Sequence, residues 1–371
     1  MKNIVVASNP FGFGPTGNAI PILKELQKRF SLKKDITVYF VGSEKCQRIV
    51  PELDSVNKIL LNERDVSVIE NFLKNLKGKT VVLGVQNRFI VEAGKNVGCA
   101  TFFLDVLAWM WTNIPESHLA ADEVFWMRFP GIVKRKAEYT NKANINIIEG
   151  IFENITRDKK IMPGSKILCL GGGFNPLRSG IQKNYLLLIA SILQLSTICN
   201  ENTEIVAGKE AVLFLKKQIA SKRLGVSALS HDEVLDKMKV IDHYISIGGQ
   251  TSTMEALLSN IPTSFFIPSN LSQLELQRIF SKEIGGNIMW WEKELEISKE
   301  KYKFMSEKEF IDLLEYVYEK TLKNKKKIKK LAKLFDDNVN NLDNQERLFK
   351  LGLWVGSGGS LEIVNKIEFY L

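Results

Sequence analysis

The stretch Ile245–Gln277, ISIGGQTSTMEALLSNIPTSFFIPSNLSQLELQ, determines how the rest of the chain is interpreted. It opens within the run His243–Ile247, whose β-branched and aromatic residues are typical of a buried strand. Gly248-Gly249 breaks this run, and the hydroxyl side chains that follow can cap a helix over Met254–Leu258. Thr263–Pro268 has the pattern of the next buried strand. The stretch therefore predicts a strand, a glycine turn, a helix and a second strand.

A glycine turn before a helix is a potential phosphate site. It presents free backbone N–H groups and the positive end of the helix dipole. Glu255 lies in the first turns of the same helix. A carboxylate there can accept both hydroxyls of a ribose while the amides before it hold a diphosphate. These are two parts of a nucleotide-diphosphate sugar, although many α/β proteins form the same turn for packing alone.

The residues that carry this pattern are Gly248, Gly249, Thr251, Thr253, Glu255, Ala256, Leu257, Ile261, Pro262, Pro268 and Gln273, and Ser252 within it is a further candidate for a phosphate contact. Together they resemble the donor-binding signature of the inverting GT-B glycosyltransferases, which include UDP-glycosyltransferases and MurG-type N-acetylglucosaminyltransferases. The resemblance implies an α/β protein of GT-B architecture, with two Rossmann-like parallel-sheet domains facing a central cleft. It further implies that Glu255 binds the donor ribose, that Gly248 to Thr253 bind the diphosphate, and that Gln273 binds sugar hydroxyls.

Two histidines found in many of the resembling proteins are absent here. Ile247 stands where a diphosphate-binding histidine precedes the glycines, so phosphate contacts must come from backbone amides and hydroxyls. Asn18 stands where the N-terminal glycine-rich turn carries the histidine that deprotonates the acceptor. An amide cannot take a proton near pH 7, so this base is missing or lies elsewhere. The resemblance directs Gly14 and Gly17 of the same turn toward the acceptor, while a tight packing turn is the alternative.

Asp105 is the second candidate for a catalytic role, beside Asn18. It ends the predicted strand Ala100–Leu104, and ligands of open α/β sheets gather at the carboxyl ends of strands. Trp109 and Trp111 follow closely and are expected to form core or a wall of the acceptor pocket. A carboxylate beside aromatic surface is suited to act as a general base. Asp105 could equally bind the acceptor, or only cap a helix that begins after it.

Strands alternate with helices along the chain, which predicts parallel sheets covered by helices. The charged and turn-forming segment that ends at Met162–Ser165 is the predicted linker. Residues 1–160 are then an acceptor-binding domain, 161–345 a nucleotide-sugar-binding domain, and 346–371 a helical segment that crosses back to the first domain. The second domain restarts with a strand and a glycine turn, and the resemblance implies that Gly172 and Gly173 face the donor diphosphate.

Composition indicates a soluble two-domain protein. The chain has 371 residues, 45% of them hydrophobic and 25% charged. It has no apolar run near the roughly 18 residues of a membrane span and no signal-peptide pattern, so we expect a cytoplasmic protein. Four widely spaced cysteines predict reduced thiols, and no metal-ligand spacing or Asp-x-Asp motif is present. We therefore predict no metal and no cofactor besides the nucleotide sugar.

The charges and histidines add little specificity. The net charge of +9 favours an anionic partner such as a nucleotide sugar, but much of it lies in Lys323–Lys333. That segment is expected to be a solvated helix face, with weak contact to an anionic surface as the alternative and no nucleic acid predicted. Ser230 and Glu233 fit a capping box, and His231 between them could contact a base or phosphate. His118 and His243 have no partner in the sequence and are expected to be structural.

The combined prediction is a metal-independent, inverting glycosyltransferase that moves a sugar from a UDP-sugar to a small-molecule acceptor. Asp105–Trp111, Ser230–Glu233 and Asn18 are also similar to cytosylglucuronate-synthase-like proteins of nucleoside-antibiotic pathways, which join a sugar nucleotide to a nucleobase. A nucleobase or a natural product is therefore an expected acceptor. Two alternatives stay open: a nucleotide-sugar 2-epimerase, and a non-catalytic GT-B-like partner of another transferase.

Overall fold

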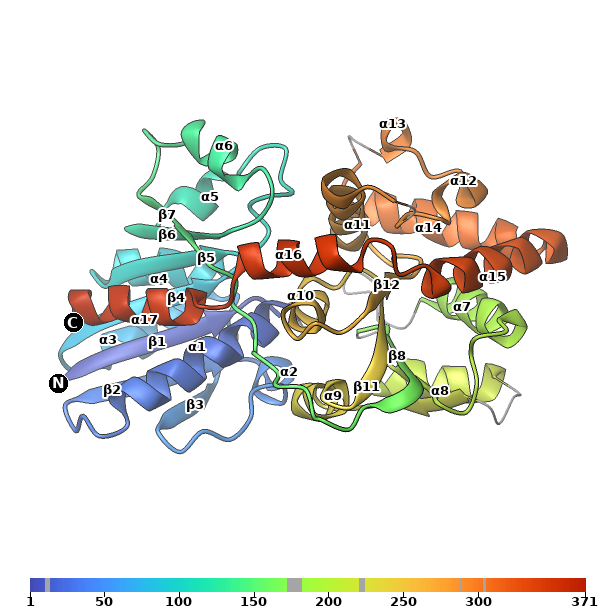
Figure 1. Cartoon of the computed structure of the whole chain (residues 1–371). Coiled ribbons are helices and arrows are strands. Elements are labelled where there is room, and N and C mark those ends of the chain that lie inside the picture. The colour runs from blue at the N-terminus through green and yellow to red at the C-terminus, as the bar shows by residue number, and fades with distance from the viewer. Residues whose placement is uncertain (11–13, 172–181, 220–223, 287, 303–304) are drawn as a thin grey trace. The chain divides into compact units, whose positions relative to one another are not determined.

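The computed structural model describes residues 1–10, 14–171, 182–219, 224–286, 288–302 and 305–371 (Figure 1). The chain divides into two compact units. The first unit comprises Met1–Glu153 together with Trp354–Leu371, and the second comprises Asn154–Leu353. The C-terminal residues therefore belong to the same unit as the N-terminus, and the helix α16 (Gln345–Val355) contains the division between the units.

A seven-stranded sheet forms the centre of the first unit, and all its strand pairs are parallel, in the order β3-β2-β1-β4-β5-β6-β7. The strands are β1 (Lys2–Ser8), β2 (Ile36–Gly42), β3 (Val56–Leu60), β4 (Lys79–Val85), β5 (Ala100–Asp105), β6 (Glu123–Met127) and β7 (Ile145–Ile148). The helices are α1 (Gly14–Phe30), α2 (Glu44–Gln47), α3 (Val66–Lys74), α4 (Arg88–Asn96), α5 (Glu116–Leu119), α6 (Ile132–Ala137) and α17 (Gly359–Tyr370).

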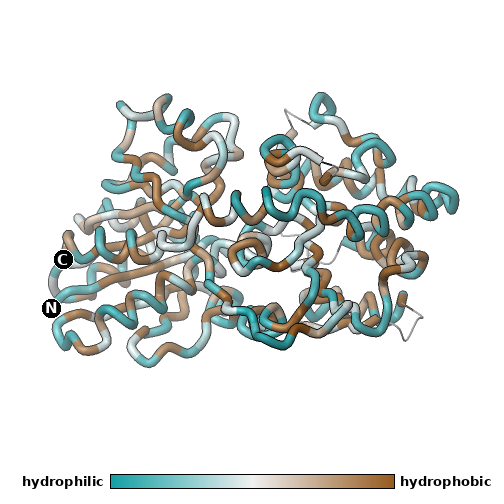
Figure 2. Tube along the Cα trace, viewed as in Figure 1, coloured by the Kyte–Doolittle hydropathy of each residue, from teal (hydrophilic) through white to brown (hydrophobic). Residues whose placement is uncertain are grey.

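Burial explains why these residues form a parallel sheet. In β1 every residue from Asn3 to Ser8 is buried, and Figure 2 shows the hydrophobic colouring along this strand. Continuous rather than alternating hydrophobic residues are expected when helices cover both faces of a sheet. The helix α17 packs against α1, where Arg29 donates a hydrogen bond to Oδ1 of Asn365 over 2.7 Å. The last helix therefore covers part of the first unit.

A five-stranded sheet forms the centre of the second unit, again with parallel pairs only, in the order β10-β9-β8-β11-β12. Its strands are β8 (Met162–Cys169), β9 (Thr203–Val206), β10 (Leu224–Ser227), β11 (Ile241–Ser246) and β12 (Thr263–Phe265). Its helices are α7 (Lys183–Leu195), α8 (Lys209–Gln218), α9 (His231–Met238), α10 (Gln250–Leu258), α11 (Leu271–Ile284), α12 (Glu292–Leu295), α13 (Lys299–Tyr302), α14 (Glu307–Leu322) and α15 (Lys325–Asn340).

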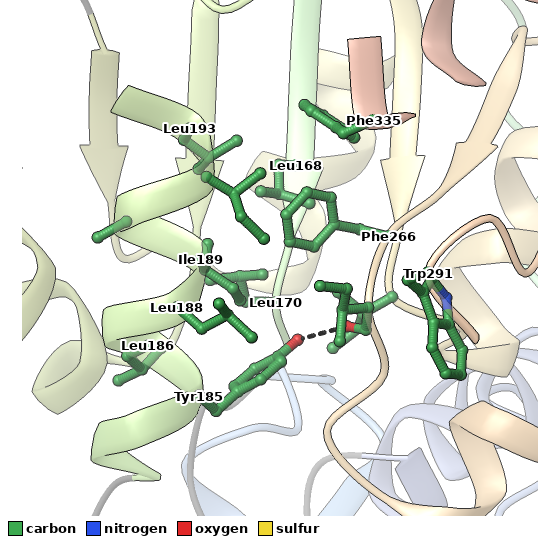
Figure 3. Packing of buried hydrophobic residues seen from close by; sticks show 14 of the residues in the cluster. Leu168, Leu170, Tyr185, Leu186, Leu188, Ile189, Leu193, Phe266, Trp291 and Phe335 are labelled. Carbon is green, nitrogen blue, oxygen red and sulfur yellow. Dashed lines mark hydrogen bonds between the residues drawn. The ribbon is translucent and has the colours of Figure 1, made fainter. Parts of the chain in front are cut away.

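The main core of the second unit joins residues of the sheet with residues of α7, α14 and α15. Figure 3 shows Leu168 of β8, Ile189 of α7 and Phe335 of α15 within this core. Tyr185 of α7 is fully buried, and its hydroxyl donates to the backbone oxygen of Ile267 over 2.9 Å. That bond holds the chain immediately after β12 against α7. Burying apolar side chains on this scale is the main stabilising contribution to such a unit.

The structure confirms the α/β class with two parallel sheets, and it corrects three local expectations. Gly14 and Gly17, predicted to lie in a glycine-rich turn, lie at the start of the helix α1 instead. Met162–Ser165, predicted as a linker, begins β8 instead. The residues that follow Asp105 form turns rather than a helix. The lysine-rich helix α15 buries Ile328, Leu331 and Phe335 and turns most of its lysines to solvent. Within the described ranges, no helix has both the length and the apolar character needed to cross a membrane.

Candidate active site

The glycine turn lies at the carboxyl end of β11, where the sequence predicted it. Gly248 has φ +96°, a conformation that side-chain-bearing residues rarely adopt. Its N–H donates to the Ser246 hydroxyl over 2.9 Å, and the helix α10 begins two residues later. No side chain of the described residues caps α10. The backbone N–H groups of Thr251 and Ser252 have no acceptor among the described residues, so they are available to an anion.

The hydroxyl-bearing residues of the turn divide into two kinds. The Thr253 hydroxyl is buried, and it is shared with Ser246 and the Gly249 carbonyl at 2.5 Å each. Thr253 therefore holds the turn in shape. Thr251 and Ser252 are partly exposed at the helix start. Of the three residues whose hydroxyls are predicted to contact a diphosphate, these two are the ones that keep exposed surface.

Glu255 is fully buried, and a histidine lies against it. Oε1 of Glu255 is 3.3 Å from Nε2 of His231, whose side chain is 22% exposed. His231 is the first residue of α9, directly after the capping box formed by Ser230 and Glu233. The structure therefore brings His231 to the residue predicted to bind a ribose.

Gln273 lies beside the glycine turn although 25 positions separate the two in sequence numbering. A Cβ atom added to Gly248 would lie 2.5 Å from the Gln273 backbone oxygen. The side-chain Oε1 of Gln273 accepts from the Ser269 N–H over 2.7 Å and from its hydroxyl over 2.9 Å. The amide Nε2 has no acceptor in the described part of the chain and can donate to a ligand.

Two further donor-site predictions cannot be placed. Gly172 and Gly173 lie outside the described residues. Cys169 ends β8 before them, and burial raises the pKa of its thiol, with the Glu255 carboxylate acting in the same direction. This thiol therefore stays protonated near neutral pH and adds no charge near Glu255.

Asp105 in the first unit is fully buried at the end of β5, and its carboxylate has three donors. Oδ1 accepts from the Leu107 N–H over 2.9 Å and from the Trp111 indole N–H over 3.4 Å. Oδ2 is 2.8 Å from Nδ1 of His118 on α5. Asp105 therefore accepts from the turn that follows it, where one alternative expected it to cap a helix, and it also contacts a histidine.

Sequence reasoning missed His118. It lies 13 positions after Asp105 in the same connection between β5 and β6, and no local motif marks it. The one available signal was that a carboxylate at a strand end and a histidine share a single connection. The His118 ring packs 4.8 Å from the Phe103 ring and 5.9 Å from Trp111, centroid to centroid.

The other predicted acceptor residues differ in how far they are exposed. Trp109 is 7% exposed and stacks on Phe129, so it belongs to the core, whereas Trp111 is partly exposed beside His118. A Cβ atom on Gly14 or Gly17 would meet nothing within 4 Å among the described residues, so packing does not require these glycines.

Asn18 lies on α1 and is almost fully buried. Its Nδ2 donates to the Gly14 carbonyl over 3.0 Å, while Oδ1 has no partner within the described part of the chain. An unpaired buried carbonyl oxygen is a free hydrogen-bond acceptor, not a base.

Among the described residues, no group of three His, Cys, Asp or Glu side chains is arranged to hold a metal ion.

Comparison with solved structures identifies the fold. The chain aligns over 99% of its length with 99% of Arabidopsis thaliana UGT89C1 complexed with UDP, at 12% identity and a TM-score of 0.57. TcCGT1 in complex with UDP aligns over 100% of both chains at 10% identity and a TM-score of 0.55. A UDP-glucosyltransferase from Polygonum tinctorium aligns over 95% of this chain and 98% of its own, at 11% identity and a TM-score of 0.52. The chain has the GT-B fold.

Neither a protein-family model nor a curated protein sequence matches the chain. The likeness is therefore one of fold.

Proposed function

We propose that this protein is a glycosyltransferase that uses a UDP-sugar as its donor. The observation that carries the proposal is the cluster in the second unit formed by the uncapped start of α10, the buried Glu255 and the amide of Gln273. Three chemically different groups of a nucleotide sugar would each find a matching partner there.

The diphosphate would bind at the N-terminus of α10. The N–H groups of Thr251 and Ser252 donate there, and the helix dipole adds a favourable field. Because Ile247 occupies the position of a phosphate-binding histidine in the resembling proteins, these amides and the hydroxyls of Thr251 and Ser252 would carry the contact. The preceding turn keeps its shape through the bond between Ser246 and Thr253.

The ribose and the sugar would use the remaining two groups. Glu255 accepts hydrogen bonds only, so it suits the paired hydroxyls of a ribose, which would take the place of the present contact with His231. Gln273 has its oxygen engaged with Ser269, and its Nε2 would donate to a sugar hydroxyl. Two of the similar structures are complexes with UDP, which supports this choice of nucleotide.

The reaction would be an inverting displacement at the anomeric carbon. The acceptor attacks this carbon as the bond to the diphosphate oxygen breaks, and UDP leaves with the electron pair. Backbone amides at the start of α10 would stabilise the negative charge that develops on the departing diphosphate. A small molecule with a hydroxyl or ring nitrogen, such as a natural product or a nucleobase, would be the acceptor.

A product assay tests this function. The protein is incubated with UDP-, dTDP- and GDP-sugars and a panel of phenols, alcohols and nucleobases, and glycosides and free nucleotide are measured. We expect UDP release coupled to glycoside formation, lost in Glu255→Ala. UDP-sugar converted to an epimer with solvent deuterium incorporated, or no turnover beside tight association with a second transferase, would overturn the proposal.

A further inference from the structure

The first unit contains a histidine and a fully buried aspartate in contact, His118 and Asp105. We propose that His118 is the general base that deprotonates the acceptor, and that Asp105 is its positioning residue. This inference rests on the proposed glycosyltransferase function. It assigns the base that Asn18 on α1 cannot provide, and it places that base on α5.

The contact with Asp105 fixes which ring nitrogen of His118 can take a proton. Oδ2 of Asp105 lies 2.8 Å from Nδ1, and a carboxylate accepts but does not donate, so Nδ1 carries the hydrogen of the neutral ring. The lone pair then lies on Nε2. This nitrogen has no partner among the residues that the structure describes, and the side chain keeps 16% of its surface exposed.

The surroundings hold the ring in this orientation. Phe103 packs on it at 4.8 Å between centroids, and Trp111 meets it edge-on at 5.9 Å. The Trp111 indole N–H also donates to Oδ1 of Asp105, so the carboxylate is held from two sides. A base fixed by packing and by a second hydrogen-bonded group is the arrangement that general base catalysis requires.

Two other residues of the first unit, Asp105 and Asn18, cannot serve as the general base. Asp105 has no exposed surface, and its oxygens already accept from Leu107, Trp111 and His118, so the acceptor cannot reach it. Asn18 has no basic nitrogen. The chain contains three histidines, and the other two, His231 and His243, belong to the second unit. His118 is therefore the one imidazole that the first unit can offer.

The proton balance of the step is simple. Nε2 of His118 takes the proton of the acceptor X–H as X bonds to the anomeric carbon and UDP departs with the electrons of the broken C–O bond. The imidazolium formed in this way is paired with the Asp105 carboxylate. It returns the proton to water after the products leave, so no further reactant is needed.

The test uses His118→Ala and two acceptors of the same shape but different acidity. One is a simple phenol, which is protonated at pH 8, and the other a nitrophenol that is already ionised there. We expect kcat/KM for the phenol to fall by about 10²–10⁴ and that for the nitrophenol to fall by less than about tenfold, because an ionised acceptor needs no base. UDP affinity should stay that of the wild type.

The outcomes separate this inference from the function on which it rests. If wild type transfers sugar and His118→Ala slows both acceptors equally, or neither, then His118 is not the base and the function stands. If wild type neither binds UDP nor forms a glycoside, the function fails and the base assignment fails with it. A loss confined to the protonated acceptor supports both.

Discussion

The backbone of Gly248 lies against the carbonyl oxygen of Gln273, so closely that an added Cβ atom would be 2.5 Å from that oxygen. This contact joins the turn after β11 to the start of α11. It brings the residues predicted to contact the diphosphate and the sugar into one cluster. A single methyl group added at Gly248 would disturb this cluster.

Gly248→Ala is therefore expected to destabilise the second unit and to weaken UDP binding. The substitution adds the contact with a backbone oxygen to the strain of φ +96°, which together cost on the order of 1–3 kcal/mol or more. Gly249→Ala is the matched control, because Gly249 has φ −68° and its nearest neighbour would be the Ser252 hydroxyl at 3.5 Å. Urea unfolding of both variants measures the difference. Equal stability would show that the turn can relax away from Gln273.

Asp105→Asn should lower turnover without changing UDP affinity. Asn keeps the shape and can still accept from Leu107, but it has no charge to stabilise the imidazolium of His118. We expect kcat to fall by about 10²-fold or more. Steady-state kinetics and UDP titration of the same preparation measure the two effects. Turnover within a few-fold of wild type, about threefold for example, would exclude a role for Asp105 in proton transfer.

Turnover should be resistant to EDTA. In the proposed mechanism the amides at the start of α10 stabilise the departing diphosphate, and no divalent ion is needed for that charge. We expect the initial rate in EDTA to stay within about twofold of the rate in buffer alone. Loss of activity in EDTA with recovery on adding Mg²⁺ would contradict the assignment of the diphosphate to backbone amides.

His243 should make the protein less stable in mild acid. Burial lowers its pKa from 6.5 to about 4, and the nearby Lys166 acts in the same direction. At pH values between about 4 and 6.5, His243 binds a proton in the unfolded chain but not in the folded chain. The free energy of unfolding therefore falls as the pH drops from 6.5 toward 4, by up to about 3 kcal/mol.

The control for this effect is His243→Gln, which does not titrate and can still contact the Ser264 hydroxyl, now 2.9 Å from Nε2 of His243. Urea unfolding at pH 7 and pH 5 measures the slope for both proteins. The wild type should lose more stability than the variant. Parallel losses would mean that His243 is not the group responsible.

The sequence was sufficient where local patterns decide the structure. The β-branched and aromatic run His243–Ile247 and the break at Gly248-Gly249 predicted a strand and a turn that the structure contains. The sequence also assigned Gly248 and Gln273 to one donor-binding signature, and in the structure the two residues are in contact. The boundaries were less accurate, since Met162–Ser165 resembles a linker by composition and pairs as a strand only because β11 lies beside it.

The sequence was insufficient where three-dimensional contact decides the role. Nothing local distinguishes His118 from a structural histidine, and its link with Asp105 depends on how the connection after β5 folds. Trp109 and Trp111 look equivalent in sequence, yet one stacks on Phe129 in the core and the other lies beside His118. His231 similarly acquires its position against Glu255 only because α9 and α10 meet in the folded second unit.

Calorimetric titration with UDP tests the central claim most directly. Titrations with dTDP and GDP show whether the site prefers one nucleobase. We compare wild type with Glu255→Ala and with Ser259→Ala, which lies at the other end of α10. The account predicts micromolar UDP binding that weakens by about 10–100-fold in Glu255→Ala and is unchanged in Ser259→Ala. Equal binding by all three proteins, or no binding of any nucleotide by the wild type, would contradict the assignment of the second unit as a nucleotide-sugar site.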